Sequence, residues 1–423
     1  MPSEFKLPTS FWEDFVRSQW KQGPVLLPQV FPEPLASVQE ITSILRHTAD
    51  AYRRRVLRTN MSLYVNRGKL EADIEHYLIT SGDSTFAEYC ERIDRDPLVK
   101  EFTLSLFGCQ VYHPALWART RTFLEGLYAQ TGYVIGHADV DIFVGNYRRT
   151  PVGIHRDAAS NFSFVVHGKK EMMFWPPEAI SRDPHSCADR NFPGSTPIQG
   201  SRGDIIFWPF DYWHIATSDV GWAVTLNVAI YLTGPFALLL RGLGSDPRLK
   251  ALPSSMDSGS ATDGPEEHSL PQGLRHGLDL YRGALNHQSL DDTLSELWIR
   301  RVSAGGFASV PPPGPLQSIS EDDIIAGSVT FPIVAIPTSD GRLLVSANGH
   351  VVACNHIDKV AHLIHVLNST SGCCVGDLLN EIAVNTSMRA NLLRLLAHLE
   401  SFGAFSVRSN SLVSPSRHLC NAR

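Results

Sequence analysis

Two long segments near the start of the chain, residues 36–57 and 114–130, carry apolar residues at every third or fourth position. This spacing places the apolar side chains on one face of a helix, so both segments are expected to be amphipathic helices. A shorter helix of the same kind is expected to begin near Phe11, followed by a strand after the break at Gly23. The beginning of the chain is therefore expected to form amphipathic helices and one short strand.

Between Tyr133 and Leu232 the pattern changes to short runs of β-branched and aromatic residues, separated by glycine, proline and asparagine. Such runs predict strands, and many short strands joined by turns are typical of a barrel or a sandwich. Residues 1–235 are therefore expected to form one domain, a β-barrel with flanking helices. The expected strands are Val140–Val144, Phe162–His167, Glu171–Trp175, Asp204–Trp208 and Ala223–Leu232.

Two polar breaks divide the rest of the chain. A helical stretch after Leu232 leads to a segment rich in Ser, Gly, Pro and Asp, residues 253–264, which predicts a flexible loop. Residues 310–315 are proline-rich and are expected to form a stiff spacer. We therefore expect a helical linker over residues 236–315 and a separate small domain over residues 316–410.

The small domain is expected to begin with three short strands, around 331–336, 342–346 and 350–354. Asp-Gly and Asn-Gly pairs separate them, and these pairs are the strongest short signal of a hairpin. Apolar spacing then predicts three helices, the last of them capped by Gly403. A hairpin followed by three helices is a winged-helix-like pattern. Because both expected domains combine helices with strands, the whole chain is expected to have an α+β fold.

Composition and charge exclude several classes of protein. The 423 residues exceed the usual size of a single hydrophobic core, so two or three domains are expected. A net charge of −6 provides no overall basic field, so nucleic acid is not an expected partner. Seven cysteines without a CxxC pair favour reduced thiols. No stretch approaches the roughly 20 apolar residues of a membrane span, and residues 1–19 lack the core of a signal peptide, so a cytoplasmic protein is expected.

The spacing His-x-Asp occurs three times, at residues 137–139, 155–157 and 356–358. The spacing alone is a weak signal, because a histidine and a nearby carboxylate often hydrogen-bond for structural reasons. The copy at 356–358 opens a predicted helix, where a cap or a surface position is expected. The copy at 137–139 has no evident distal partner, whereas the copy at 155–157 lies between two predicted strands.

His155 and Asp157 have such a partner in His214, which comes 59 residues after His155 and just after the predicted strand 204–208. Two imidazoles and one carboxylate can occupy one face of a metal ion and leave the opposite face open, which suits non-heme Fe(II). Alternate residues of a strand point to the same side, so His155 and Asp157 can project together into the barrel mouth. These three residues are the predicted metal ligands and catalytic residues of an iron oxygenase.

The runs 155–162 (HRDAASNF), 168–177 (GKKEMMFWPP) and 203–214 (GDIIFWPFDYWH) together resemble the JmjC/cupin-like 2-oxoglutarate oxygenases. The resemblance implies a double-stranded β-helix, Fe(II) on the His-x-Asp…His set, and 2-oxoglutarate and O2 as co-substrates. It also implies a lysine on the next strand that binds the distal carboxylate of 2-oxoglutarate. Lys170 matches this lysine and Lys169 is its competitor, because neighbouring strand residues face opposite ways.

The asparaginyl-hydroxylase branch of this family has two asparagines near the metal-bound end of the co-substrate. One follows the first histidine by six residues and the other lies on the strand after the distal histidine, and Asn161 and Asn227 fit these places. The branch also has a hydroxyl side chain three residues before the first histidine, where this chain has Val152. The alternatives for that hydroxyl group are Thr150, if an insertion shifts the strand, and a tyrosine, Tyr147 or Tyr112.

The run from Phe11 to Leu27 resembles the opening of the cupin-like ribosomal oxygenases, which continue with a helical dimerisation segment and a C-terminal winged helix. The order of these segments agrees across nearly the whole chain. The resemblance implies a peptide or protein substrate and a homodimer formed through the helical linker. The small domain is also similar to PqqD-like peptide-recognition modules, since it too is a hairpin followed by three helices.

The resemblance implies hydroxylation of a residue in a peptide or protein, and two alternatives stay open. One is an N-methyl-lysine demethylase of the same fold, for which Tyr212, Trp213 and Trp208 are available around a cationic side chain. The other is a catalytically silent cupin that acts as a scaffold. DNA binding is not expected of the small domain, because its third helix carries only Arg389 and Arg394 as cations.

Overall fold

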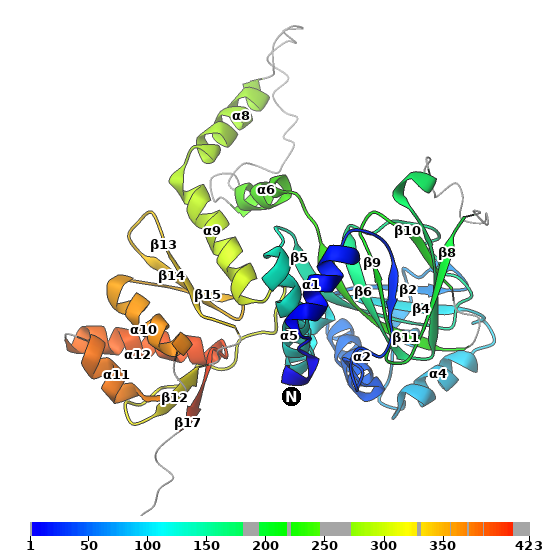
Figure 1. Ribbon diagram of the computed structural model, residues 1–423, viewed down its shortest axis with the longest axis horizontal. Coiled ribbons are helices and arrows are strands. Elements are labelled where there is room, and N and C mark those ends of the chain that lie inside the picture. The colour runs from blue at the N-terminus through cyan, green and yellow to red at the C-terminus, as the bar shows by residue number, and fades with distance from the viewer. Residues whose placement is uncertain are drawn as a thin grey trace, which may run out of the picture. The chain divides into compact units, whose positions relative to one another are not determined.

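The computed structural model describes residues 2–180, 194–217, 221–245, 272–327, 331–355, 357–369, 372–383 and 385–408. The chain divides into two compact units (Figure 1). The first unit contains residues 1–234 and 306–312, and the second contains residues 235–305 and 313–423. The predicted flexible loop 253–264 lies outside the described residues, as do His356, Cys187 and Cys420.

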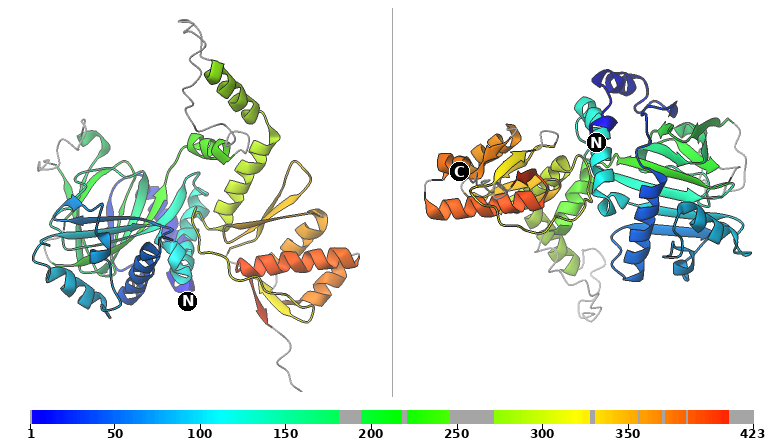
Figure 2. Two further views of the ribbon diagram at one scale, coloured as in Figure 1. Left: turned by 180° about the vertical axis from the view of Figure 1, so that it is seen from behind. Right: turned by 90° about the horizontal axis from the view of Figure 1, so that it is seen from below.

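Two antiparallel sheets form the centre of the first unit (Figures 1 and 2). Among the described residues, the larger sheet has eight strands in the order β1-β9-β6-β11-β5-β4-β2-β3, and the smaller has three in the order β10-β7-β8. The strands are β1 (Val25–Leu27), β2 (Asn60–Val65), β3 (Gly68–Lys69), β4 (Phe102–Phe107), β5 (His137–Gly145), β6 (Ala159–His167), β7 (Lys169–Trp175), β8 (Thr196–Ser201), β9 (Ile205–Trp208), β10 (Trp213–Thr217) and β11 (Ala223–Tyr231).

Strand β11 shows how alternation builds the two faces of the larger sheet. Leu226 and Val228 are fully buried on one face, whereas Thr225 and Asn227 point to the other face and line a cavity. Helices cover the first face, where the rings of Phe123 and Phe162 meet edge to face at 5.1 Å. The helices of this unit are η1 (Pro2–Phe5), α1 (Thr9–Ser18), α2 (Val38–Arg53), α3 (Ile74–Tyr77), α4 (Phe86–Asp94), η2 (Cys109–Tyr112), α5 (Pro114–Thr131) and η3 (Pro177–Ala179).

The predicted α+β architecture of this unit is confirmed. Helices α2 and α5 correspond to the predicted segments 36–57 and 114–130, and α2 begins with a capping box in which Ser37 and Glu40 bond reciprocally. Each of the five expected strands is present, as β5, β6, β7, β9 and β11. Three strands that the sequence analysis did not predict, β4, β2 and β3, extend the larger sheet beyond β5.

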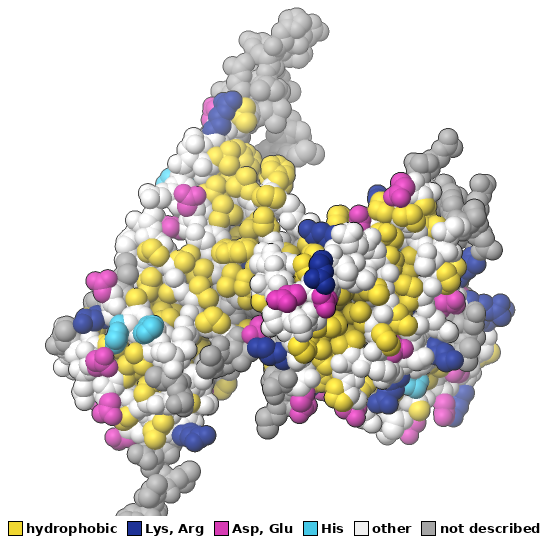
Figure 3. All heavy atoms as spheres, in the orientation of Figure 1, with side chains coloured by type: hydrophobic (Ala, Val, Ile, Leu, Met, Phe, Trp, Pro, Cys, Tyr) yellow, Lys and Arg dark blue, Asp and Glu magenta, His cyan; other side chains and the backbone are white. Residues whose placement is uncertain are grey.

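The second unit begins with a helical arm, α6 (Pro235–Ser245), α8 (Gln272–Leu285) and α9 (Gln288–Ser303). Apolar side chains gather on the surface of this arm (Figure 3). The large apolar residues Phe236, Leu240 and Leu285 of the arm are exposed. Such a surface is compatible with the predicted homodimer contact, which stays a prediction. No helix in the described part of the chain is long and apolar enough to span a membrane.

The small domain follows the arm, and its predicted elements are present. Asn348 and Gly349 form the turn between β14 and β15 with φ of 51° and 82°, as a two-residue hairpin requires. Gly403, with φ of 72°, follows the last helix. The elements are β12 (Ile324–Gly327), β13 (Val334–Pro337), β14 (Leu343–Ala347), β15 (His350–Cys354), α10 (Ile357–Ser369), β16 (Cys373–Cys374), α11 (Val375–Ile382), α12 (Thr386–Ser401) and β17 (Phe405–Arg408).

One of the two cations expected on the third helix is paired. The guanidinium of Arg389 on α12 donates to both carboxylate oxygens of Glu321, at 2.5 and 2.6 Å. This pairing engages the charge of Arg389 within the domain, and the expectation that the domain does not bind DNA stays a prediction. The winged-helix assignment and the three-domain division stay predictions.

Candidate metal centre

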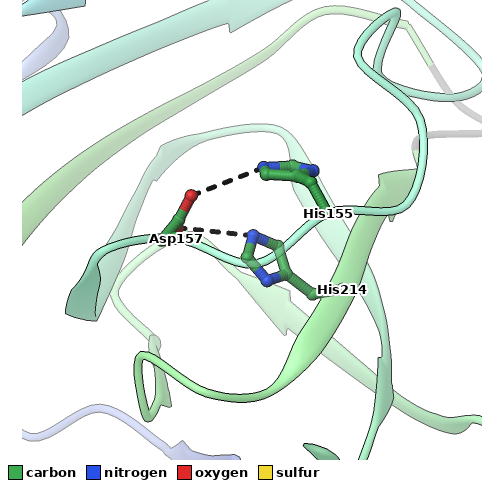
Figure 4. Close-up of side chains that lie close together, drawn as sticks. All are labelled: His155, Asp157 and His214. Carbon is green, nitrogen blue, oxygen red and sulfur yellow. Dashed lines mark ion pairs between the residues drawn. The ribbon is translucent and has the colours of Figure 1, made fainter. Parts of the chain in front are cut away.

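The side chains of His155, Asp157 and His214 converge on one point of the first unit (Figure 4). The Nε2 atoms of His155 and His214 lie 3.5 and 3.4 Å from the two carboxylate oxygens of Asp157. One ligand atom from each residue can be chosen so that all three lie within 4.8 Å of one another. In the described part of the chain, this is the one cluster of histidine, cysteine and carboxylate groups with such spacing.

Backbone pairing brings the two histidines together across 59 residues of sequence. The N–H of His155 donates to the carbonyl of His214 at 3.1 Å, and the N–H of His214 donates back at 2.8 Å. His214 itself lies in β10, which pairs with β7, and Asp157 lies just before β6. The sequence analysis placed His214 after a strand, whereas the structure places it within a further one, so its backbone is held on both sides.

Hydrogen bonds to carbonyl groups orient both imidazole rings. Nδ1 of His155 lies 3.0 Å from the carbonyl oxygen of Gly153, and Nδ1 of His214 lies 3.2 Å from that of Tyr212. Because a carbonyl oxygen only accepts, each Nδ1 carries the proton in the neutral ring. The lone pair of each Nε2 therefore points toward the shared centre, which is the tautomer that a metal ligand needs.

The pKa values of Asp157 and His155 are shifted in opposite directions. Burial raises the pKa of the Asp157 carboxyl, but the two imidazoles outweigh burial and hold the pKa well below its ordinary value. Burial lowers the pKa of His155, and the hydrogen bond to Asp157 more than compensates, so the net direction is upward. The cluster thus has a permanent carboxylate that attracts positive charge, either protons on the imidazoles or a metal ion.

A cavity of about 390 Å³ opens between the two sheets beside these residues. Lys170 on β7 is one of the residues that line it. On the same strand, Phe174 pairs with His214 of β10. Lys170 and Phe174 are four residues apart, so their backbones are about 13 Å apart along the strand at 3.3 Å per residue. Lys170 is 6% exposed and donates to the hydroxyl of Tyr147, whereas Lys169 is exposed. The cavity wall therefore contains the candidate ligand set and a buried cation on β7, the strand that pairs with the His214 strand β10.

Three polar atoms on the cavity wall are buried and have no hydrogen-bond partner within the described residues. They are Oγ1 of Thr150, Oδ1 of Asn227 and Nε1 of Trp208. A buried polar atom without a partner costs about 1–3 kcal/mol, so such atoms mark places where a polar ligand is expected. The donor set of two imidazoles and one carboxylate, together with these atoms, fits a metal ion and a polar co-substrate.

The remaining predicted site residues differ in whether they reach the cavity. Asn161 is not among the residues that line the cavity, and its amide donates to Oδ2 of Asp157 at 2.8 Å. The hydroxyl of Tyr112 accepts from the N–H of Arg58 at 2.9 Å, away from the cavity. Of the three hydroxyl groups left open by the sequence, those of Thr150 and Tyr147 are on the cavity wall.

The sequence analysis missed part of the cavity wall. Hydroxyl groups of Ser105, Ser163 and Thr225 line it, on β4, β6 and β11. Their signal was alternation, because each is a small polar residue between two larger apolar residues within a buried strand.

Residues 36–182 match the cupin-like domain family. The matched segment includes His155, Asp157 and Lys170 and ends before His214. No curated protein matches the chain in sequence.

Solved structures share the fold. One is described as YcfD, a ribosomal oxygenase from Escherichia coli, with a TM-score of 0.50 at 14% identity, covering 94% of this chain and 98% of that chain. The same protein in complex with cobalt and 2-oxoglutarate has the same TM-score, identity and coverage. A further structure of E. coli YcfD has a TM-score of 0.51 at 14% identity and the same coverage. At this identity the similarity demonstrates a shared fold across nearly the whole chain.

Proposed function

We propose that this protein is an Fe(II)- and 2-oxoglutarate-dependent oxygenase that hydroxylates a residue in a peptide or protein. The observation that carries the proposal is the cavity, because one cavity is lined both by His155, Asp157 and His214 and by the buried Lys170. Bound Fe(II), with 2-oxoglutarate and O2, supplies the conversion of a C–H bond to C–OH as 2-oxoglutarate becomes succinate and CO2.

In this proposal the three ligands hold the metal through two imidazole Nε2 atoms and one carboxylate oxygen. Lys170 binds the distal carboxylate of 2-oxoglutarate through a charge-assisted hydrogen bond, and Tyr147 positions the ammonium and completes that site. Oγ1 of Thr150 and Oδ1 of Asn227, which have no hydrogen-bond partner among the described residues, make polar contacts with the bound co-substrate. The apolar remainder of the wall excludes water and strengthens these interactions.

A protein substrate is proposed because one of the solved structures that share the fold is described as a ribosomal oxygenase. That description belongs to the E. coli protein, and the shared fold covers 94% of this chain. A cytoplasmic location is part of the same proposal.

The test is incubation of the purified protein with Fe(II), ascorbate and 2-oxoglutarate, followed by measurement of succinate and mass spectrometry of ribosomal proteins as candidate substrates. Succinate formation together with the gain of one oxygen on a peptide supports the hydroxylase. Loss of a methyl group with release of formaldehyde identifies a demethylase instead. Absence of both 2-oxoglutarate binding and succinate leaves a scaffold.

A further inference from the structure

Two buried asparagines, Asn161 on β6 and Asn227 on β11, lie on neighbouring strands and have similar exposure, 3% and 6%. Equal roles at the co-substrate are the expectation from the sequence. Their contacts differ, however, because Asn227 lines the cavity and has a buried oxygen without a hydrogen-bond partner among the described residues. Asn161 is absent from the lining and is bonded on its donor side.

The hydrogens of the Asn161 amide are both in use. Nδ2 donates to Oδ2 of Asp157 at 2.8 Å and to the carbonyl oxygen of Ala159 at 3.0 Å. Both partners only accept, so the NH2 group must face them and the orientation of the amide is fixed by chemistry. An amide held in this way has no hydrogen left to donate to a co-substrate.

The backbone of Asn161 is held within a strand, whereas the backbone of Asp157 lies outside any strand. Asn161 pairs with Trp208 of β9 on one side and with Ala229 of β11 on the other. Asp157 lies in the connection that precedes β6, between the exposed residues Arg156 and Ala158. The hydrogen bond from Asn161 therefore ties the carboxylate of a connecting segment to the middle of the larger sheet.

We propose that Asn161 is a positioning residue, which fixes the carboxylate of Asp157 for metal binding and does not bind the co-substrate. The inference deepens the proposed function, since it rests on the same metal site. A carboxylate that is already oriented loses less freedom when it binds the ion. Loss of such an outer partner typically weakens metal affinity about 10–100-fold.

The experiment compares Asn161→Ala with Asn227→Ala in the full-length protein. Co(II) alone is titrated into each metal-free protein, and 2-oxoglutarate is then titrated into each protein at saturating Co(II). For Asn161→Ala we expect the Kd for Co(II) to rise about 10–100-fold, with the Kd for 2-oxoglutarate within about threefold of wild type. For Asn227→Ala we expect the reverse pattern. Thermal melting of the metal-free proteins checks that both variants are folded.

Wild-type Co(II) affinity in Asn161→Ala together with weaker 2-oxoglutarate binding would overturn the inference and make Asn161 a co-substrate ligand. If the alanine variant does not fold, Asn161→Ser provides the same comparison, because its hydroxyl is too short to replace the amide. Because the Co(II) titration needs no turnover, it can test the positioning role of Asn161 even if the proposed oxygenase function is wrong. Metal affinity that depends on Asn161, in a wild-type protein that makes no succinate, would remove the oxygenase function and leave the positioning role.

Discussion

The pairs at 137–139 and 155–157 have identical spacing and lie in the same unit, yet they have different surroundings. The ring of His137 stacks on Tyr231 at 4.4 Å, and Asp139 accepts from the side chain of Gln110 at 2.8 Å. His155 instead faces a second imidazole, that of His214, with a ring separation of 4.4 Å. The third side chain and the tautomer-fixing carbonyl groups, not the spacing, make one pair a candidate metal site.

The largest expected effect comes from removing a ligand of the second pair. Asp157→Ala or His155→Ala leaves two ligands and is expected to reduce succinate formation by roughly 10³-fold or more. His137→Ala is the matched control, and we expect its succinate formation and metal affinity to stay within about threefold of wild type. An equal loss in His137→Ala would contradict the distinction between the pairs.

Lys170 and Lys169 repeat the comparison at adjacent positions of one strand. Lys170→Ala removes a charge-assisted hydrogen bond of about 1.5–3 kcal/mol, which corresponds to a rise of about 10–100-fold in KM for 2-oxoglutarate. Lys169→Ala removes an exposed cation of the opposite face and is expected to change KM by less than about twofold. Steady-state kinetics with varied 2-oxoglutarate measures both, and equal KM values for the two variants would refute the assignment.

Tyr147 is expected to have a smaller effect, because it contributes one neutral hydroxyl beside Lys170. Tyr147→Phe keeps the ring against the lysine and loses about 0.5–1.5 kcal/mol, or roughly 2–10-fold in KM for 2-oxoglutarate. Thr150→Val, in a separate measurement, distinguishes the two hydroxyl groups on the cavity wall. A larger effect of Thr150→Val would make Thr150 the principal hydroxyl at the co-substrate.

The smallest expected effect concerns the folding stability that depends on Asp141, two residues after the pair at 137–139. Burial, and then the carboxylate of Asp139, raise the pKa of Asp141 well above its ordinary value. The native state therefore binds a proton more tightly than the unfolded chain, whose Asp pKa is about 3.9. Stability from this group is complete below that pH and is lost as the pH rises toward the raised pKa.

Asp141→Asn cannot ionise and keeps an oxygen that can accept from the N–H of Gly108. We expect the metal-free variant to melt above wild type at pH 7.5, by roughly 2–4 °C for each kcal/mol regained, and to approach wild type at pH 4. Scanning calorimetry at the two pH values measures the difference. A larger gain at pH 4 than at pH 7.5 would contradict the direction of the pKa shift.

The sequence predicted most elements of the first unit because their patterns are local. The apolar spacing of α2 and the short runs of β6 and β11 are visible in windows of about ten residues. Strand β10 was missed because Trp213 and His214 follow a turn with little alternation, and its pairing with β7 is not local. The three residues of the candidate metal centre could be selected from the sequence because the chemistry of two imidazoles and one carboxylate restricts the choice.

Other features depended on three-dimensional contacts. The sequence left Thr150, Tyr147 and Tyr112 as alternatives, and only the fold shows which side chains reach the cavity. It also assigned Asn161 and Asn227 equal roles, because the pattern does not show the path of the chain just before β6, which brings the Asn161 amide to the carboxylate of Asp157, four residues earlier. A pattern in one strand predicts the face of a residue, but not the neighbour that it meets.

The central claim is that the metal ligands and Lys170 form one site, and calorimetric titration of 2-oxoglutarate tests it most directly. The protein is titrated anaerobically with and without Fe(II). The account predicts that wild type binds one 2-oxoglutarate per chain when Fe(II) is present, and that Asp157→Ala and Lys170→Ala each weaken this binding strongly. Binding that is absent with Fe(II), or that is equally tight without the metal and in both variants, would contradict it.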